Sequence, residues 1–455
     1  MINTCVDIEF TNMKIVSKSS TNAMLGLALT IGTAVSSTQA CAADATWITT
    51  WTASPQPVWG ADFLFPTNIP ATLRDQTVRQ VARVSLGGKR VRIVLSNAYG
   101  KQPIIVGKAT IALPAADGDG GLINDSLRIT TFGGHETATI LPGASLVSDP
   151  VALSVPALGQ VTVSVYLPES TPVTTFHWDG RQTGWIVAGD QTTVATPPPS
   201  GPKTESTTAR TLLSGVLVEA PSTTQTIAVI GDSITDGATA SLDKDSRWPD
   251  FLAARLAPYG VGVVNAGISG ARLLSDGMGV NALARIDRDV LAQPGVKSVV
   301  VMLGINDISW PGTAFAPTSA LPTLEALTSG YRQLIAQAHA RGIRVIGATL
   351  TPFEGALPGT PLDNYYQREK DALRQRVNAW IRDGGAFDAV IDFDAALRDP
   401  VHPSRMNARF DSGDHLHPGD EGNRAMAETV DIDALLPGIG LTRQALSSDS
   451  GIVRE

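Results

Sequence analysis

A serine flanked by acidic residues, at the end of a short apolar run, is the first residue in this chain that could do chemistry. Residues 227–230 are all apolar, which predicts a buried strand, and Gly231 breaks the run just before Asp232 and Ser233. A chain leaving a parallel strand through a tight turn places the turn residue at the carboxyl edge of the sheet, where open α/β folds bind ligands. Ser233 is therefore a candidate nucleophile, although Gly-Asp-Ser also occurs in ordinary turns.

A serine hydroxyl is a weak nucleophile and needs a base, normally a histidine held by a third group. Two stretches read Asp-x-x-His-Pro, one with Asp399 and His402 and the other with Asp414 and His417. In both, the spacing lets the carboxylate fold back onto its own histidine and hold the tautomer. We favour Asp414 and His417, because a helix-start signal follows them and would fix their loop. His415 is expected to be an exposed loop residue. The other histidines are expected in the β region or on a helix: His135, His177 and His339.

Acyl transfer also needs hydrogen-bond donors aimed at the developing oxyanion, each contributing about 2.7–4 kcal/mol. Gly267 follows a strand expected at 261–265 and can present its backbone N–H without side-chain hindrance. Asn306 follows a strand expected at 298–303 and can present a side-chain amide. Each motif alone is a common loop sequence. Together, a Ser, a Gly, an Asn and a His following strands of one parallel sheet would meet at its carboxyl edge.

Strands alternate with helical patterns over residues 223–440, which predicts a three-layer α/β/α domain with a parallel sheet. The expected strands are 226–231, 261–265, 298–303, 343–350 and 389–393. The expected helices are 247–257, 282–291, 323–340, 364–382 and 422–429.

Residues 43–222 predict an antiparallel β-sandwich of the jelly-roll kind, because short alternating runs are separated by turn residues. The expected strands are 77–85, 90–96, 104–113, 127–131, 160–167 and 211–219. Gly87-Gly88 is expected to form a hairpin loop between the first two. The proline-rich stretch 197–202 is expected to be an exposed connection.

The first 42 residues predict a cleavable signal peptide, with a basic start, an apolar run at 23–35 and a small-residue site ending at Ala42. The mature protein is then expected to be secreted or periplasmic, without membrane insertion. Met13 as the true start and lipidation at Cys41 are alternatives. Both cysteines, Cys5 and Cys41, lie in the removed segment, so no disulfide or cysteine-bound metal is expected. Residues 441–455 are expected to form a C-terminal tail, which is polar from Ser447 onward.

Composition places the rest of the chain among globular proteins. Of the 455 residues, 43% are apolar and 17% are charged, which suggests two or three domains with a buried core. The net charge of -8, without any basic stripe, argues against nucleic acid as a partner. The sequence does not indicate an oligomeric state.

Four separated motifs resemble, in order, the four blocks of the SGNH, or GDSL-type, esterases and acylhydrolases. They are Gly231-Asp232-Ser233-Ile234, Gly267, Gly304-Ile305-Asn306-Asp307 and Asp414-His415-Leu416-His417, and the resemblance covers residues 224–436. It implies a flavodoxin-like SGNH fold in which Ser233 is the nucleophile and His417 the base, oriented by Asp414. It also implies an oxyanion hole made by the N–H groups of Ser233 and Gly267 and the side chain of Asn306. Ile234 stands where the eponymous motif has leucine, which keeps an apolar residue.

Residues 51–56 and 73–80 resemble the front domain of a two-domain branch that includes acetyl-xylan-esterase-like proteins. The expected function is therefore an exported serine esterase for small-molecule or polysaccharide esters, with acetyl groups on carbohydrate as the first candidate. No cofactor or metal is expected, and the rate should fall on the acid side as His417 becomes protonated. The tryptophans at 59, 178 and 185 could stack on sugar rings or belong to the core. The alternatives are a lipid or short-chain acylhydrolase and an inactive carbohydrate-binding or adhesion protein.

Overall fold

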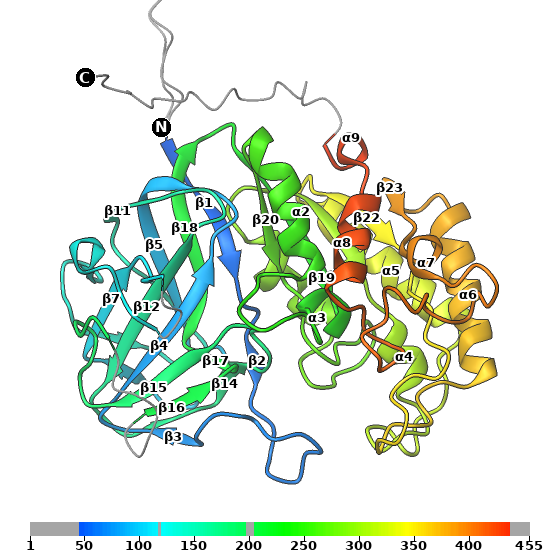
Figure 1. Cartoon of the computed structure of the whole chain (residues 1–455), viewed down its shortest axis with the longest axis horizontal. Coiled ribbons are helices and arrows are strands. Elements are labelled where there is room, and N and C mark those ends of the chain that lie inside the picture. Colours follow the sequence, from blue (N-terminus) through cyan, green and yellow to red (C-terminus); the bar gives the residue numbers. More distant parts are fainter. Residues whose placement is uncertain (1–44, 117–119, 197–203, 437–455) are drawn as a thin grey trace, which may run out of the picture. The chain divides into compact units, whose positions relative to one another are not determined.

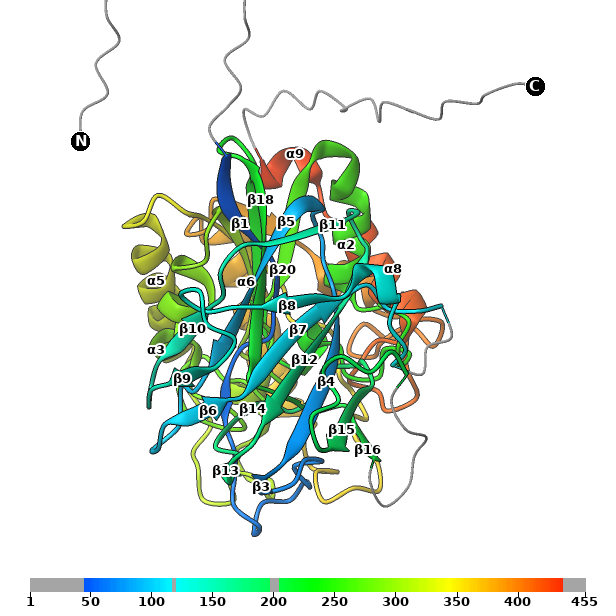
Figure 2. The same cartoon turned by 90° about the vertical axis from the view of Figure 1, so that its left-hand side faces the viewer.

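The computed structural model describes residues 45–116, 120–196 and 204–436 (Figure 1). We call the described residues of 43–222 the β part and those of 223–440 the α/β part. Figure 2 shows the strands of the β part facing the viewer, with the helices of the α/β part behind them. The expected signal peptide, the proline-rich connection and the polar tail lie outside the described residues. None of the described helices combines the length and the apolar character needed to cross a bilayer.

The α/β part is built on a five-stranded parallel sheet with the strand order β20-β19-β21-β22-β23. Its strands are β19 (Gln225–Gly231), β20 (Val261–Asn265), β21 (Val296–Met302), β22 (Arg344–Ala348) and β23 (Ala389–Ile391). In chain order this is 2-1-3-4-5, the flavodoxin-like order, whose ligand site lies where the direction of winding reverses, between the first and third strands. All five strands expected from the sequence are confirmed, within a few residues at their ends.

Helices cover both faces of this sheet. They are α1 (Ser233–Asp236), α2 (Trp248–Leu256), α3 (Ala282–Ile286), α4 (Ile305–Ser309), α5 (Leu324–His339), α6 (Arg368–Asp383), α7 (Phe393–Leu397), α8 (Asp420–Thr429) and α9 (Ile432–Leu435). Helix α2 packs on β20 and α8, whereas α5 packs on β22, α3 and α6. The helix expected at 282–291 is α3 continued by a π-helical turn, Asp287–Leu291.

The β part consists of antiparallel sheets. The two larger sheets have the strand orders β16-β15-β4-β12-β7-β8 and β1-β18-β5-β10, with β11 also pairing with β5, and the smaller ones are β17-β14-β2, β13-β3 and β6-β9. The first half of the strands comprises β1 (Ala45–Thr52), β2 (Gln56–Pro57), β3 (Thr72–Leu73), β4 (Gln76–Arg83), β5 (Gly88–Ser96), β6 (Ile104–Val106), β7 (Lys108–Ala112), β8 (Arg128–Thr130) and β9 (Ala138–Ile140). The others are β10 (Ser145–Val147), β11 (Val151–Val155), β12 (Gln160–Leu167), β13 (Thr171–Pro172), β14 (Thr175–His177), β15 (Gly184–Ala188), β16 (Thr204–Thr207), β17 (Arg210–Thr211) and β18 (Leu213–Pro221). Side chains from both large sheets form one buried apolar core.

The prediction of a hairpin around Gly87-Gly88 is wrong. Strand β4 belongs to the six-stranded sheet and β5 to the other large sheet, so the chain crosses between sheets instead of turning back on itself. The backbone N–H of Val84 donates to Gly159, and that of Ser85 donates to Thr50. Alternation of apolar and polar residues identifies both strands, but it is the same whether two strands share a sheet or face each other across a core.

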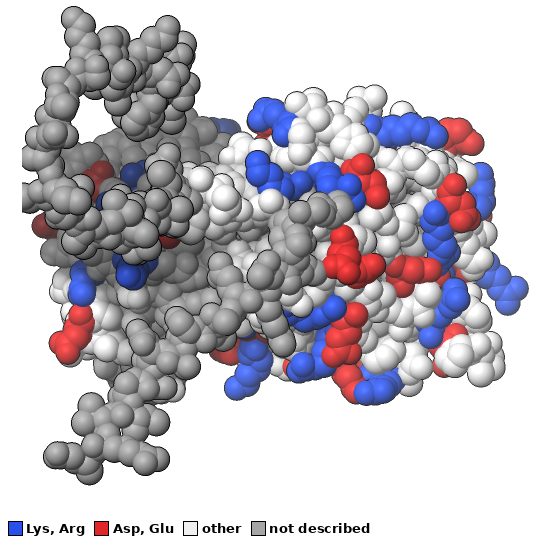
Figure 3. All heavy atoms as spheres, turned by 90° about the horizontal axis from the view of Figure 1, so that it is seen from above, with Lys and Arg blue, Asp and Glu red and all other residues white. Residues whose placement is uncertain are grey.

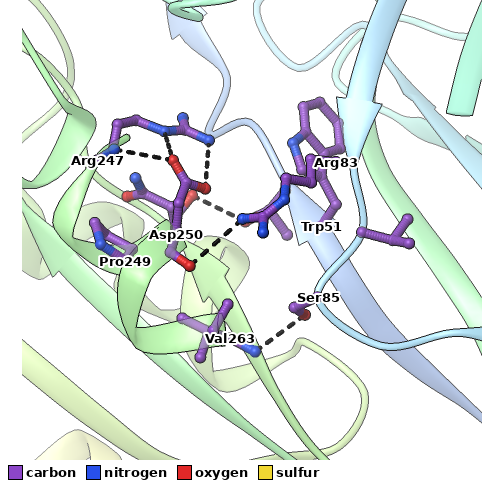
Figure 4. A pocket seen from close by; sticks show the side chains of 11 residues that line it. Trp51, Arg83, Ser85, Arg247, Pro249, Asp250 and Val263 are labelled. Carbon is purple, nitrogen blue, oxygen red and sulfur yellow. Dashed lines mark hydrogen bonds and ion pairs between the residues drawn. The ribbon is translucent and has the colours of Figure 1, made fainter. Parts of the chain in front are cut away.

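The β part and the α/β part are joined by hydrogen bonds around a small cavity of about 20 Å³ (Figure 4). The backbone N–H of Val263 donates to the Ser85 hydroxyl over 3.0 Å. Arg83 reaches the backbone oxygen of Asp250, whose carboxylate accepts from Arg247 at 2.7 and 3.1 Å. A cavity of this size holds about one water molecule and is too small for a substrate. It belongs to the interface between the two parts.

Charged side chains of both signs are intermingled on the face shown in Figure 3. The described residues visible there form no extended stripe of a single sign. The described part of this face that the view leaves uncovered therefore shows no electrostatic footprint of the kind that attracts a polyanion.

Candidate active site

Ser233 lies at the first position of α1, directly after β19. Asp232 caps the helix by accepting the backbone N–H of Ile234 at 3.0 Å. A Cβ atom on Gly231 would lie 2.1 Å from the Thr235 hydroxyl, so only glycine allows the chain to turn this tightly. The turn leaves the Ser233 hydroxyl half-buried at the carboxyl edge of the sheet.

The Ser233 hydroxyl oxygen lies 2.8 Å from Nε2 of His417. On the other side of the ring, Nδ1 of His417 lies 2.6 Å from Oδ2 of Asp414. The second carboxylate oxygen of Asp414 accepts the backbone N–H groups of Leu416 and His417. Burial acts to raise the pKa of Asp414, but the hydrogen bonds and charge of His417 outweigh it and hold the pKa well below its usual range. An ionised Asp414 fixes the Nδ1–H tautomer and leaves Nε2 free to accept the serine proton.

The other Asp-x-x-His pattern forms only an exposed loop. The Asp399 carboxylate accepts the backbone N–H groups of Val401 and His402, and it makes no bond to the His402 ring. His415 is also exposed, as expected, and its Nδ1 lies 2.5 Å from Asp411. Of these three histidines, the structure brings only His417 to Ser233.

Asn306 stands in the first turn of α4, after β21, and lines the same cavity as Ser233. One amide N–H donates to the backbone oxygen of Ala271 at 3.0 Å. The amide oxygen accepts the hydroxyl of Tyr365 at 2.8 Å. These two bonds fix which way the amide faces, because only the nitrogen can donate and only the oxygen can accept. One N–H of Asn306 is left for the cavity, and Tyr365 is a site residue that the sequence analysis did not identify.

The glycine brought to the cavity is Gly270, three residues after the expected Gly267. The backbone N–H of Gly267 donates to the Asn265 side chain at 2.8 Å, and Gly267 does not line the cavity. Gly270 does line it, with a φ of 71°, a conformation that favours glycine. Neither the N–H of Gly270 nor that of Ser233 makes a hydrogen bond within the described part of the chain. Both N–H groups are therefore available to a ligand.

A buried pair behind the site links it to the β part. Nε2 of His177 lies 3.0 Å from Oδ1 of Asp236, the last residue of α1. The other oxygen of Asp236 accepts the N–H and the hydroxyl of Ser269, both at 2.8 Å. Burial lowers the pKa of His177, but the Asp236 charge and hydrogen bonds raise it overall. No motif in the sequence indicated this contact, because His177 lies on β14, in the other part of the chain.

Two further buried carboxylates lie next to the site. Burial raises the pKa of Asp232 to about 7, and that of Asp307 to about 6. Asp307 accepts the N–H groups of Leu273 and Leu274 and so holds the loop that follows Gly270. The described residues contain no group of three or more His, Cys, Asp or Glu side chains placed to bind a metal. That the protein requires no cofactor stays a prediction from the sequence.

The cavity at Ser233 has a volume of about 290 Å³. Besides Ser233, Asn306, His417 and Asp414, its lining is mostly apolar and comes from both parts of the chain. The lining of this cavity combines a hydroxyl, a base and three residues, Ser233, Gly270 and Asn306, that each have an N–H without a partner among the described residues. This arrangement can attack a carbonyl and stabilise the resulting oxyanion.

Comparisons with known proteins place the α/β part in a family. Residues 227–430 match the model of the GDSL-like Lipase/Acylhydrolase family. No curated protein gave a match. Similar solved structures include a GDSL-like lipase from Bacteroides thetaiotaomicron VPI-5482, with 20% identity over 45% of this chain and 85% of that one, and a TM-score of 0.33. The acetyl xylan esterase AlAXEase has 19% identity over 45% of this chain and 96% of its own, with a TM-score of 0.33. An α/β hydrolase from the metagenome of Lake Arreo, Spain, has 24% identity over 45% and 92%, with a TM-score of 0.32. By the family match alone, residues 227–430 are a GDSL-like lipase/acylhydrolase domain.

Proposed function

We propose that this protein is an exported serine esterase that hydrolyses carboxylic esters through an acyl-enzyme on Ser233. The observation that supports this most directly is the continuous hydrogen-bonded series from the Ser233 hydroxyl through His417 to Asp414, at 2.8 and 2.6 Å. Three side chains in this order activate a serine in unrelated hydrolases.

In the first half-reaction, the Ser233 oxygen attacks the ester carbonyl while Nε2 of His417 takes the hydroxyl proton. The tetrahedral oxyanion accepts hydrogen bonds from the N–H groups of Ser233 and Gly270 and from the amide of Asn306. His417 then gives its proton to the leaving alcohol as the carbon–oxygen bond breaks. In the second half-reaction His417 takes a proton from water, the hydroxide adds to the acyl carbon, and the acid leaves as His417 returns the proton to Ser233.

Gly270 takes the place that the sequence analysis gave to Gly267. Supporting this choice, the N–H of Gly267 already has a partner, whereas that of Gly270 has none among the described residues, and Gly270 lines the cavity with Ser233 and Asn306. A crystal structure of the enzyme phosphonylated on Ser233 tests it. The phosphoryl oxygen should lie about 2.7–3.1 Å from the nitrogen atoms of Gly270 and Asn306. Contact with the Gly267 nitrogen in their place would contradict the proposal.

The activity is tested with p-nitrophenyl esters and a fluorophosphonate probe. Ser233→Ala and His417→Ala should each remove ester hydrolysis, and Ser233→Ala should also remove labelling. The matched control is His402→Ala, which changes the histidine of the other Asp-x-x-His pattern and should keep full activity. Intact wild type that neither hydrolyses an ester nor reacts with the probe would favour an inactive binding protein.

Two substrate classes remain from the sequence: acetyl groups on carbohydrate, and lipid esters or short-chain esters. The apolar lining of the cavity favours the second class. Export and a domain division at residue 222 complete the proposal, and both remain predictions from the sequence.

A further inference from the structure

We propose that the cavity at Ser233 binds an apolar group of the ester larger than acetyl, and that the β part supplies the wall that selects it. This inference rests on the proposed esterase activity. The group is either a medium-length acyl chain or an aromatic or aliphatic alcohol, since both present the same chemistry to the cavity. The wall consists of Leu64, Phe65 and Trp178, and we call it the β wall.

The first argument is the chemical nature of the lining. The α/β part faces the β wall with Met278, Trp310, Phe315, Leu357, Leu362 and Leu416. Apart from the groups assigned to catalysis, the polar residues of the lining are fewer than the apolar ones: Asp179, Thr239, Ser269, Thr360 and Tyr365. A sugar ring carries a hydroxyl on nearly every carbon and would leave most of them without partners here, at a cost in binding. An apolar group is stabilised by the same surface.

The second argument is volume. The cavity measures about 290 Å³, whereas an apolar cavity of about 150 Å³ is large enough to hold benzene. An acetyl group would fill only a small share of the space next to Ser233. The remaining apolar surface of the cavity would stay in contact with water. A longer or wider substrate covers this surface and therefore binds more tightly.

The third argument is the way the aromatic rings of the β wall are used. Phe65 stacks on Trp178 with ring centres 5.4 Å apart and also contacts Phe315 edge-on at 5.4 Å. The indole N–H of Trp178 donates to Pro66, and that of Trp59 donates to Phe65. The aromatic ring faces and indole N–H groups that could bind a sugar therefore already make contacts within the protein.

The remaining tryptophan considered for sugar binding lies elsewhere. Trp185 is 8% exposed and packs with Val81 and Val187 on the six-stranded sheet. Leu64, in contrast, is 39% exposed although it lines the cavity. A partly exposed leucine in the lining of the cavity that holds the nucleophile is suited to contact an apolar substrate.

The test measures kcat/KM in two series with the full chain. One series keeps the p-nitrophenyl group and lengthens the acyl chain from acetate to octanoate. The other keeps acetate and varies the alcohol from ethyl to hexyl, phenyl and naphthyl. In the series whose group enters the cavity, kcat/KM should rise about fourfold for each added methylene until the cavity is full. Acetylated xylo-oligosaccharide is measured alongside both.

Variants of the β wall then connect the preference to these residues. Leu64→Ser and Phe65→Ala should each lower the ratio of kcat/KM for the best large substrate to kcat/KM for the smallest substrate of the same series, by about tenfold. The matched control is Leu141→Ser, because Leu141 is a leucine of the β part that is 60% exposed and does not line the cavity. It should leave the ratio unchanged. If Phe65→Ala fails to fold, the exposed Leu64 keeps the test possible.

Two results would overturn the inference. One is a flat or falling profile in both series, with acetylated xylo-oligosaccharide preferred over every apolar ester. The other is an unchanged ratio in Leu64→Ser. Both leave ester hydrolysis intact and are distinct from failure of the proposed function, in which wild type hydrolyses no ester and Ser233 is not labelled by a fluorophosphonate.

Discussion

The Nε2 atom of His177 lies 3.0 Å from Oδ1 of Asp236, so a histidine of the β part holds the helix that begins with Ser233. Nδ1 of the same ring lies 3.1 Å from the backbone oxygen of Ser54, which can only accept a hydrogen bond. Both ring nitrogens therefore donate, and His177 is held as a cation against the carboxylate. Through Ser269, Asp236 also fixes the residue next to Gly270.

Replacing His177 by leucine should destabilise the protein strongly, because Asp236 would remain buried without its cationic partner. Loss of one member of a buried pair costs about 3–5 kcal/mol of unfolding free energy. Urea denaturation measures this, with His135→Leu as a control at an exposed histidine of the same part. Adding Asp236→Asn to His177→Leu removes the unpaired charge and should restore part of the loss. An equal loss of unfolding free energy in His177→Leu and His135→Leu would contradict the assignment of His177 as the cationic partner of Asp236.

Changing Asp414 to asparagine should lower kcat by about 10³–10⁴-fold, because the amide no longer fixes the tautomer of His417 that can accept the serine proton. The matched control is Asp411→Asn, since Asp411 makes the corresponding contact to His415, away from Ser233. The control should retain nearly full kcat toward a p-nitrophenyl ester. Similar losses in the two variants would mean that the loop, and not the tautomer, is affected.

The parallel sheet could be predicted from the sequence because its strands are short apolar runs separated by helical periodicity. Their order then brings Ser233, which follows the first strand, next to Asn306, which follows the third. The glycine that we propose for the oxyanion hole, Gly270, could not be predicted in the same way. Gly267 and Gly270 belong to one loop, and neither has a side chain that would block its N–H, so the sequence does not distinguish them. In the structure they differ because the N–H of Gly267 donates to the Asn265 side chain.

Trp178 lines the cavity and was considered as a substrate contact from the sequence, but the other contributions of the β part to the site could not be predicted. His177 and Phe65 lie far from Ser233 along the chain, and neither belongs to a motif. Their proximity to the cavity follows from how two sets of sheets pack, which periodicity does not encode. The same limit explains the false hairpin, because β4 and β5 have the same alternation although they lie in different sheets.

Removing the hydroxyl of Tyr365 should reduce kcat about 3- to 10-fold with little change in KM. In Tyr365→Phe the Asn306 oxygen loses its donor, so the amide is no longer fixed toward the oxyanion, and one such bond contributes about 0.5–1.5 kcal/mol. The control is Tyr366→Phe, at the next residue, which does not line the cavity. Asn306→Ala should cost about 10²–10³-fold. In that background Tyr365→Phe should have no further effect on kcat, and an additive loss would show that Tyr365 acts independently of Asn306.

The buried carboxyl of Asp232 should make the protein less stable as the pH rises. Burial raises its pKa to about 7 in the folded state, whereas an aspartate in an unfolded chain has a pKa of about 3.9. Between these values the unfolded chain releases the proton and the folded protein keeps it. The free energy of unfolding therefore falls through this window, by on the order of 2–4 kcal/mol from this one group.

Asp232→Asn should remove that fall, because an amide does not ionise. The asparagine oxygen can still accept the N–H of Ile234, which caps α1. The second carboxylate oxygen of Asp232 has no partner within the described residues, so the new amide breaks no existing bond there. Urea denaturation from about pH 4.5 to 7.5 should show the variant gaining stability relative to wild type as the pH rises. Asp62→Asn, at an exposed aspartate, should run parallel to wild type. A constant difference between Asp232→Asn and wild type would mean that Asp232 is already ionised at the acid end of the range, and that its carboxylate is stabilised by neighbours despite its burial.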